Sequence, residues 1–248
     1  GMIHAQKASP DDRSDLIRHI VADKVTSYTL AQAITAALLA RERGHGGQHL
    51  HVPMLDASLA FFWPDGMMHK TMVGEDVALP LKLSDFYRVY PTGDGQVVAF
   101  AQSPSELEGL ARALDREDWL EEPGFTNIAT HLADFETFIN RVEGAMAPFS
   151  TEEVVARLQA QDVPVAPVLD HDEVLADPQV QHNEAVMTRE HPRYGRYQQP
   201  RHPIQFSVTP AAPAGHPPLQ GEHSREILLE LGYSEADIDG LYGKGVIA

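Results

Sequence analysis

Residues 85–103, DFYRVYPTGDGQVVAFAQS, constrain the fold more than any other stretch of the sequence. Two runs rich in β-branched and aromatic residues flank Gly93-Asp94-Gly95, a pattern typical of a β-hairpin. Ser103 follows at once, with Glu106 three residues later, so the pair predicts a capping box that starts a helix. A hairpin that leads directly into a helix predicts a mixed α+β unit.

The remainder of this unit alternates in the same way. Pro104 suits the first position of the predicted helix, and its apolar residues recur at helical spacing, which predicts a buried stripe of Leu107, Leu110, Ala111 and Leu114. Further elements are expected in chain order: helices near 129–146 and 151–161 (the second capped by Ser150 with Glu153), a strand in 163–169, short helical turns over 170–183 and paired strands in 185–200.

At the N-terminal side, Thr29 and Gln32 predict a capping box, and a helix from there with Gly44 as its left-handed cap. Apolar residues alternate over 48–54, which predicts a short strand. Asp56 then predicts the cap of a helix that reaches Trp63, where Pro64 kinks or ends it. Near the other end, five prolines make 208–218 an extended linker before two terminal helices.

The glycine-rich loop Gly44-His45-Gly46-Gly47 raises the possibility of a phosphate site. Phosphate loops follow a strand and precede a helix, because the helix N-terminus supplies free N–H groups and a positive dipole. Here the predicted order is reversed, and the loop carries no Walker lysine. A connection between elements is therefore the preferred interpretation.

Composition restricts the partners of the chain. Its formal net charge of −17 over 248 residues disfavours nucleic acid and anionic membranes as partners. It contains no cysteine, which excludes disulfides, thiolate zinc sites and a cysteine nucleophile, and fits the cytoplasm. Apolar runs fall short of the roughly 20 residues of a membrane-spanning helix, and the first residues do not resemble a signal peptide.

Candidate chemistry is sparse. His49 and His51 share one face of the predicted strand, but a third metal ligand at a suitable spacing is missing, so we expect no metal site. Ser103 is a possible nucleophile that a helix N-cap explains better. Trp63 and Met67 either line an acyl pocket or belong to the apolar end of a helix.

Three blocks, 20–68, 162–180 and 221–247, together resemble the family III CoA-transferases, a group that includes formyl-CoA and carnitine CoA-transferases and α-methylacyl-CoA racemases. The resemblance implies an α/β fold, with a partial Rossmann-like large domain and a smaller α+β domain, lacking the N-terminal half of the family fold. It assigns 1–73 to the large domain, 74–83 to a linker, 84–207 to the small domain, and 208–248 to a linker and helices that return to the large domain.

The resemblance also implies what the chain does. Family members transfer CoA between carboxylic acids through an aspartate that aligns before residue 1, so no catalytic residue is assigned within 1–248. Coenzyme A thioester is expected as a substrate, with no bound cofactor. At Gln102-Ser103-Pro104, racemases place a glutamate and transferases a glycine-rich loop, and neither pattern is met.

Gln102, Ser103, Trp63 and Met67 are therefore the candidate substrate-binding residues. The open alternatives are a transferase that needs the N-terminal half, an inactive homologue that acts as a binding or regulatory subunit, and a racemase-like enzyme. The expected partner is a second copy of the chain, since family subunits interlock, or a separately encoded N-terminal half.

Overall fold

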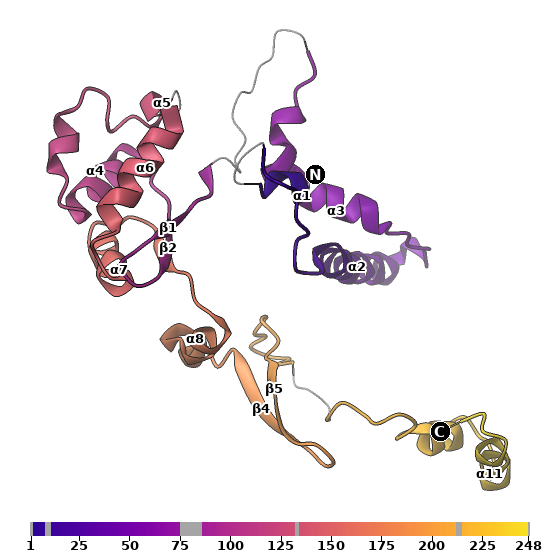
Figure 1. The fold of residues 1–248 in the computed structure, drawn as a ribbon. Helices are drawn as coiled ribbons and strands as arrows, with labels where there is room; N and C mark the ends of the chain where they lie inside the picture. The colour runs from indigo at the N-terminus through magenta and orange to yellow at the C-terminus, as the bar shows by residue number, and fades with distance from the viewer. Residues whose placement is uncertain (1, 8–10, 75–85, 132–133, 212–214, 248) are drawn as a thin grey trace. The chain divides into compact units, whose positions relative to one another are not determined.

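The computed structural model describes residues 2–7, 11–74, 86–131, 134–211 and 215–247. The chain divides into two compact units, Gly1–Val168 and Leu169–Ala248, and each is considered by itself (Figure 1). Apart from Gly74, the predicted linker 74–83 lies outside the described residues, and the predicted domain boundaries stay predictions. None of the described helices is both long and apolar enough to cross a bilayer.

The first unit opens with two helices that pack along each other, α2 (Val21–Ala40) and α3 (Met54–Phe62). Shorter helical segments accompany them: α1 (Met2–Ala5), η1 (Arg41–His45), η2 (Trp63–Met67) and η3 (Met68–Lys70). Gly44 lies in the left-handed region at φ 90°, as predicted for the cap. Pro64 lies in η2 and α3 ends at Phe62, so of the two predicted effects of Pro64, a kink or an end, the structure shows the end of the α-helix.

The predicted helix start at Thr29 is wrong, because α2 begins at Val21. The Thr29 hydroxyl donates to the carbonyl of Val25 at 2.9 Å, one turn earlier in the same helix. A threonine hydroxyl satisfied in this way is compatible with a helix interior, so the Thr-x-x-Gln pattern marked no boundary.

The predicted strand over 48–54 is also wrong. Residues 46–53 form an irregular connection, and no described strand pairs with them, so their alternating pattern has no sheet to join. Met54 starts α3 after Pro53, whose φ of −65° and ψ of 134° place it just outside the helix. Asp56 therefore lies in the first turn of α3 instead of capping it.

The predicted hairpin around Gly93-Asp94-Gly95 is confirmed. It consists of β1 (Val89–Pro91) and β2 (Gln96–Ala99), and β3 (Val165–Pro167) adds to β2 from far along the chain. The sheet order is β1-β2-β3 and both pairs are antiparallel. Both outer strands therefore end on a proline.

Five helical segments enclose the main core together with this sheet. They are α4 (Pro104–Ala113), η5 (Glu117–Glu121), α5 (Ile128–His131), α6 (Phe135–Met146) and α7 (Thr151–Gln159). The capping boxes predicted at Ser103 and Ser150 are both present. The predicted stripe of α4 is fully confirmed, since Leu107, Leu110, Ala111 and Leu114 are all buried.

The hairpin turn is fastened to the start of α7. The Asp94 carboxylate accepts hydrogen bonds from the backbone N–H of Thr151 at 2.7 Å and from its hydroxyl at 2.9 Å. These bonds, that of the Thr151 N–H first, hold the pKa of Asp94 below its usual value. The turn and α7 are therefore joined by a carboxylate that is bound in its ionised form.

The second unit begins with α8 (His171–Ala176) and α9 (Pro178–His182), which confirm the short helical turns predicted over 170–183. The predicted strand pair is confirmed as an antiparallel hairpin of β4 (Val186–His191) and β5 (Gly195–Pro200). The two predicted terminal helices are α10 (Ser224–Glu230) and α11 (Glu235–Gly243).

Candidate functional site

Gln102 and Ser103 lie between β2 and α4, where the chain turns from the sheet into the helix. The carboxylate of Glu106 accepts the backbone N–H of Gln102 and that of Ser103, both at 2.9 Å. These two bonds, that of Ser103 first, lower the pKa of Glu106. The N–H groups of this loop are thus occupied by a carboxylate that belongs to the same helix.

The Ser103 hydroxyl serves the helix as well. It accepts the N–H of Glu106 at 3.3 Å, which completes the capping box. It also lies 3.1 Å from the hydroxyl of Ser105. The N-cap interpretation of Ser103 accounts for these contacts.

An apolar cavity of about 30 Å³ lies beneath this loop, with Gln102 in its lining. Tyr90 from β1 and Leu110 from α4 line it as well, and α6 adds Phe138 and Val142. Burial raises the pKa of Tyr90 to about 12, so its phenol stays protonated near neutral pH. The cavity has the size of one small group and is bounded by one neutral hydroxyl-bearing ring and otherwise mainly apolar side chains.

Trp63 and Met67 lie in η2, and the indole Nε1–H of Trp63 donates to the Thr71 hydroxyl at 3.0 Å. In the part of the chain that the structure describes, no hydrogen bond or ring contact joins them to Gln102 or Ser103. The four candidates therefore form two separate pairs. Gln102 lines a cavity, and the substrate-binding role of all four residues stays a prediction.

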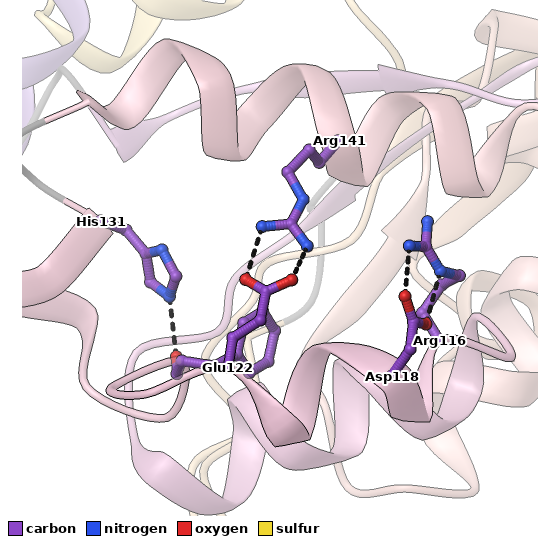
Figure 2. Close-up of polar contacts among 6 residues, drawn as sticks. Arg116, Asp118, Glu122, His131 and Arg141 are labelled. Carbon is purple, nitrogen blue, oxygen red and sulfur yellow. Dashed lines mark hydrogen bonds and ion pairs between the residues drawn. The ribbon is translucent and has the colours of Figure 1, made fainter.

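Two guanidinium groups hold Trp119 in the core beside the cavity-lining helices. Arg116 and Arg141 lie 4.5 and 4.9 Å from the centre of the Trp119 rings. Figure 2 shows the carboxylates that hold these two guanidiniums. Arg116 donates two hydrogen bonds to the carboxylate of Asp118, at 2.7 and 2.8 Å, and Arg141 donates two to that of Glu122, at 2.6 and 2.9 Å. The guanidinium partners lower the pKa of both carboxylates. This frame fixes the position of α6 relative to η5.

Sequence reasoning missed Tyr90, Trp119 and the arginines that bracket Trp119. Trp119 is one of only two tryptophans in the chain, which was the one available signal for a central packing role. A metal site is not formed among the described residues, where no three His, Asp or Glu side chains gather.

A larger hollow of about 490 Å³ covers the face of the sheet that points away from the helices. Val89, Val98 and Ala166 form a row across it, since they are partners in the registers of the three strands. Val89 and Val98 are 47% and 41% exposed. A solvated sheet face is ordinarily polar, so this apolar row marks a surface suited to contact with another apolar surface.

Comparison with known proteins places these features in a family. The sequence matches CoA-transferase family III over residues 1–224. The chain belongs to this family. Family III relatives include formyl-CoA:oxalate CoA-transferases of Escherichia coli O157:H7 (strain EC4115 / EHEC) and of Shigella dysenteriae serotype 1 (strain Sd197), each 26% identical over 88% of this chain. The family III chain described here spans 58% of the length of either relative.

Solved structures agree on the fold. Rv3272 from Mycobacterium tuberculosis has a TM-score of 0.75 at 24% identity, over 91% of this chain and 60% of that protein. A CaiB/BaiF family protein from Brucella suis has a TM-score of 0.72 at 21% identity, over 93% of this chain and 60% of that one. The predicted fold class, an α/β fold of the family III type, is confirmed.

Proposed function

We propose that residues 1–248 are part of a cytoplasmic enzyme that transfers CoA from an acyl-CoA to a carboxylic acid. The observation that carries the proposal is the match to CoA-transferase family III over residues 1–224. The relatives named as formyl-CoA:oxalate CoA-transferases support a small carboxylic acid as the acceptor. CoA thioester is then a substrate, and no cofactor takes part.

Transfer between two carboxylic acids needs a nucleophile that takes the acyl group while CoA leaves as a thiolate. In the family this group is an aspartate that aligns before residue 1. We therefore assign the nucleophile to a polypeptide segment outside residues 1–248. The loop at Gln102 and Ser103, with the cavity beneath it, is the contribution of this chain to the acyl side of the site.

We expect the pure chain to show no CoA transfer between formyl-CoA and oxalate, or with other short acyl-CoA donors, because covalent transfer cannot start without its nucleophile. Adding the polypeptide that supplies the N-terminal half of the family fold from the same genome is expected to produce transfer. Chromatographic separation of the acyl-CoA species measures both. The control is the same polypeptide with its nucleophilic aspartate changed to asparagine.

Two results would count against the proposal. Turnover by the pure chain that a point substitution within 1–248 abolishes would show that the nucleophile lies in this chain. The second result is a stable complex of the two polypeptides that binds acyl-CoA but transfers no CoA, although the N-terminal polypeptide carries its nucleophilic aspartate. That result would favour the second candidate function.

That second candidate is a binding or regulatory subunit without catalysis of its own. The observation in its favour concerns Glu106. Its carboxylate already accepts hydrogen bonds from the backbone N–H groups of Gln102 and Ser103, which would otherwise be free to donate to a substrate oxygen. The racemase-like alternative has no comparable support, because Gln102-Ser103-Pro104 stands where racemases place a glutamate.

The exposed apolar face of α2 supports an interface with a second polypeptide. Leu30, Ile34 and Leu38 follow one another at four-residue spacing and are 39%, 44% and 46% exposed, and Phe61 of α3 is 58% exposed. Contiguous apolar patches of this kind on an isolated protein mark protein–protein contact. We propose a second copy of the chain as the occupant when no N-terminal half is present.

Light scattering of the pure chain at low micromolar concentration is accordingly expected to give twice 27.3 kDa. Ile34→Glu is expected to shift the protein toward the monomer, because it sets a charge in the middle of the apolar face. Gln32→Glu adds the same charge to an exposed position on another side of α2 and is expected to leave the dimer intact. A well-behaved wild-type species at 27.3 kDa would rule out this interface.

A further inference from the structure

The β4–β5 hairpin is basic, although the formal net charge of the chain is −17. Against one acidic residue, Glu190, the span 189–201 contains Arg189, Arg193, Arg196 and Arg201. Arginines elsewhere in the described chain mostly pair with a carboxylate at 3.4 Å or less. On the hairpin, the only ion pair between described residues joins Arg196 to Glu190 at 3.8 Å, and both side chains are exposed. The hairpin therefore carries positive charge that the described chain leaves largely unpaired.

This unpaired charge is available to a partner at one end of the hairpin. Arg189 and Arg201 each donate to a backbone carbonyl within the unit, at 2.7 and 2.8 Å. Arg193 lies in the turn between β4 and β5, and Arg196 follows it in β5, and both are exposed. We call Arg193, Tyr194 and Arg196 the tip. It combines two guanidiniums with an aromatic ring, a composition typical of the residues that dominate protein–protein binding.

The tip is held in one conformation by a buried histidine. Nδ1 of His191 accepts the backbone N–H of Arg193 at 3.0 Å and that of Tyr194 at 3.2 Å. Because Nδ1 accepts, Nε2 carries the proton and donates to the Pro217 carbonyl at 3.0 Å. Tyr194 is nevertheless 69% exposed. An exposed anchor on an ordered turn loses little conformational entropy when it binds.

Negative charge gathers around α8 in the same unit. Without any lysine or arginine, the span 170–177 contains Asp170, Asp172, Glu173 and Asp177. Three of these carboxylates accept backbone N–H groups at the starts of α8 and α9, and that of Asp172 does not. The ion pairs between described residues of this unit include none of the four. Val174 and Leu175, which lie among these acids, are exposed. The surface of α8 is thus complementary to the tip in both charge and apolar character.

The tip and α8 lie at opposite ends of the hairpin. Gln181 of α9 donates to the Leu175 carbonyl of α8, and the Ala185 N–H donates to the Val180 carbonyl, so both helices adjoin the start of β4. Figure 1 shows the turn between β4 and β5 at the far end. The six residues of β4 separate the ends by roughly 17 Å, whereas an ion pair requires about 4 Å. One chain therefore does not pair its own tip with its own α8.

We infer that the tip docks on α8 of a second copy of the chain, while the tip of that copy docks on α8 of the first. Such a two-fold contact satisfies both charged surfaces of both copies and closes on itself, so it stops at two. Tyr194 packs against Val174 and Leu175, and the two arginines face the carboxylates around them. At an ionic strength of about 0.15 M, charges more than about 8 Å apart are largely screened, so the net charge of the copies opposes this contact only weakly.

Charge reversal in the full chain tests the contact from both sides. Arg193→Glu with Arg196→Gln reverses the tip, and glutamine is used at 196 because a glutamate there would face Glu190 across the strands. His171→Lys with Asp172→Lys reverses the exposed start of α8 and removes no capping carboxylate. Each double variant is expected to raise the dissociation constant of the dimer by about ten- to a hundredfold in sedimentation velocity, since attraction becomes repulsion at two contacts.

An equimolar mixture of the two double variants is the decisive measurement. In the mixed dimer each tip meets an α8 of opposite charge, so the dissociation constant is expected to return to within about tenfold of the wild-type value. The matched control is Arg13→Glu with Arg18→Gln, which makes the same change in net charge on exposed arginines of the first unit. This control is expected to associate as the wild type does.

Three results overturn the inference. They are a wild-type dissociation constant in either double variant, weakened dimers that mixing does not strengthen, and a wild-type chain that does not self-associate, which would leave the tip for another acidic partner. The contact goes beyond the proposed function and does not use the α2 face. Weakening by Ile34→Glu with no effect of the tip and α8 variants would therefore refute this contact alone. Since the two reversals lie on different elements, misfolding of one variant, seen by circular dichroism, leaves the other as a test.

Discussion

Replacement of Trp119 by alanine is expected to lower the free energy of unfolding by about 3–5 kcal/mol, the range for loss of a fully buried large aromatic side chain. Trp119 is 0% exposed and its rings lie 5.6 Å from those of Phe125. Arg116 and Arg141 cover it as cations, and alanine would leave both guanidiniums over a void. Urea denaturation followed by far-ultraviolet circular dichroism gives this free energy without relying on tryptophan fluorescence.

Trp119→Phe is the matched control. The indole Nε1 of Trp119 is buried without a hydrogen-bond partner in the described chain. Phenylalanine removes this unsatisfied donor while it keeps an aromatic ring between the arginines, so its cost is expected to stay below about 2 kcal/mol. An alanine variant that unfolds at the same urea concentration as the phenylalanine variant would show that Trp119 is not central to this core.

Gly109→Ala is expected to destabilise the chain by about 1–3 kcal/mol, the usual cost of forcing extra volume into a packed site. A Cβ on Gly109 would lie 2.8 Å from the carbonyl oxygen of Gln161 and 2.9 Å from Cγ2 of Val163. Glycine thus lets α4 approach the chain between α7 and β3. This crowding outweighs the ~1 kcal/mol by which alanine is the better helix former.

Gly144→Ala, in α6 of the same unit, is expected to change the free energy of unfolding in the opposite direction. Apart from its chain neighbours and the backbone of its own helix, no atom of the described residues lies within 4 Å of a Cβ built on Gly144, so the added methyl group meets open space. Alanine is then expected to stabilise the chain by about 0.5–1 kcal/mol, through helix propensity alone. Thermal or urea unfolding compares the two variants, and the same sign for both would refute the close approach at Gly109.

Local chemistry was predictable from the sequence. Ser103 with Glu106, and Ser150 with Glu153, each contain the whole capping interaction within four residues, so neighbours elsewhere cannot alter it. The hairpin turn at 93–95 is local in the same sense. These signals located the loop that carries two of the candidate residues.

The two wrong predictions, the helix start at Thr29 and the strand over 48–54, arose where one sequence pattern is compatible with two structures. A Thr29 hydroxyl either caps a helix or bonds to the carbonyl four residues earlier, and the sequence does not distinguish them. The alternation over 48–54 predicts a strand only if a partner strand exists, and among the described residues none pairs with it. A strand, unlike a helix, depends on residues far away in the chain.

The candidate site was predictable only in outline for the same reason. Gln102 was identified by position, but the cavity beside it depends on Tyr90 and on α6, which meet only in the folded unit. The hydrogen bond between His191 and the Pro217 carbonyl joins residues that are 26 positions apart in the chain. A single buried histidine in a chain with 13 histidines has no distinguishing mark until its hydrogen bonds are known.

The prolines that end both outer strands of the sheet bear on how this protein behaves at high concentration. Thr92 N–H bonds to the Gly95 carbonyl and Val168 N–H to that of Gln96, so the nitrogens of Pro91 and Pro167 point away from β2. A foreign strand that docked on either free edge would find a missing donor there. The small sheet is thereby protected against edge-to-edge growth into fibrils, even though the apolar row of Val89, Val98 and Ala166 on its exposed face would favour stacking.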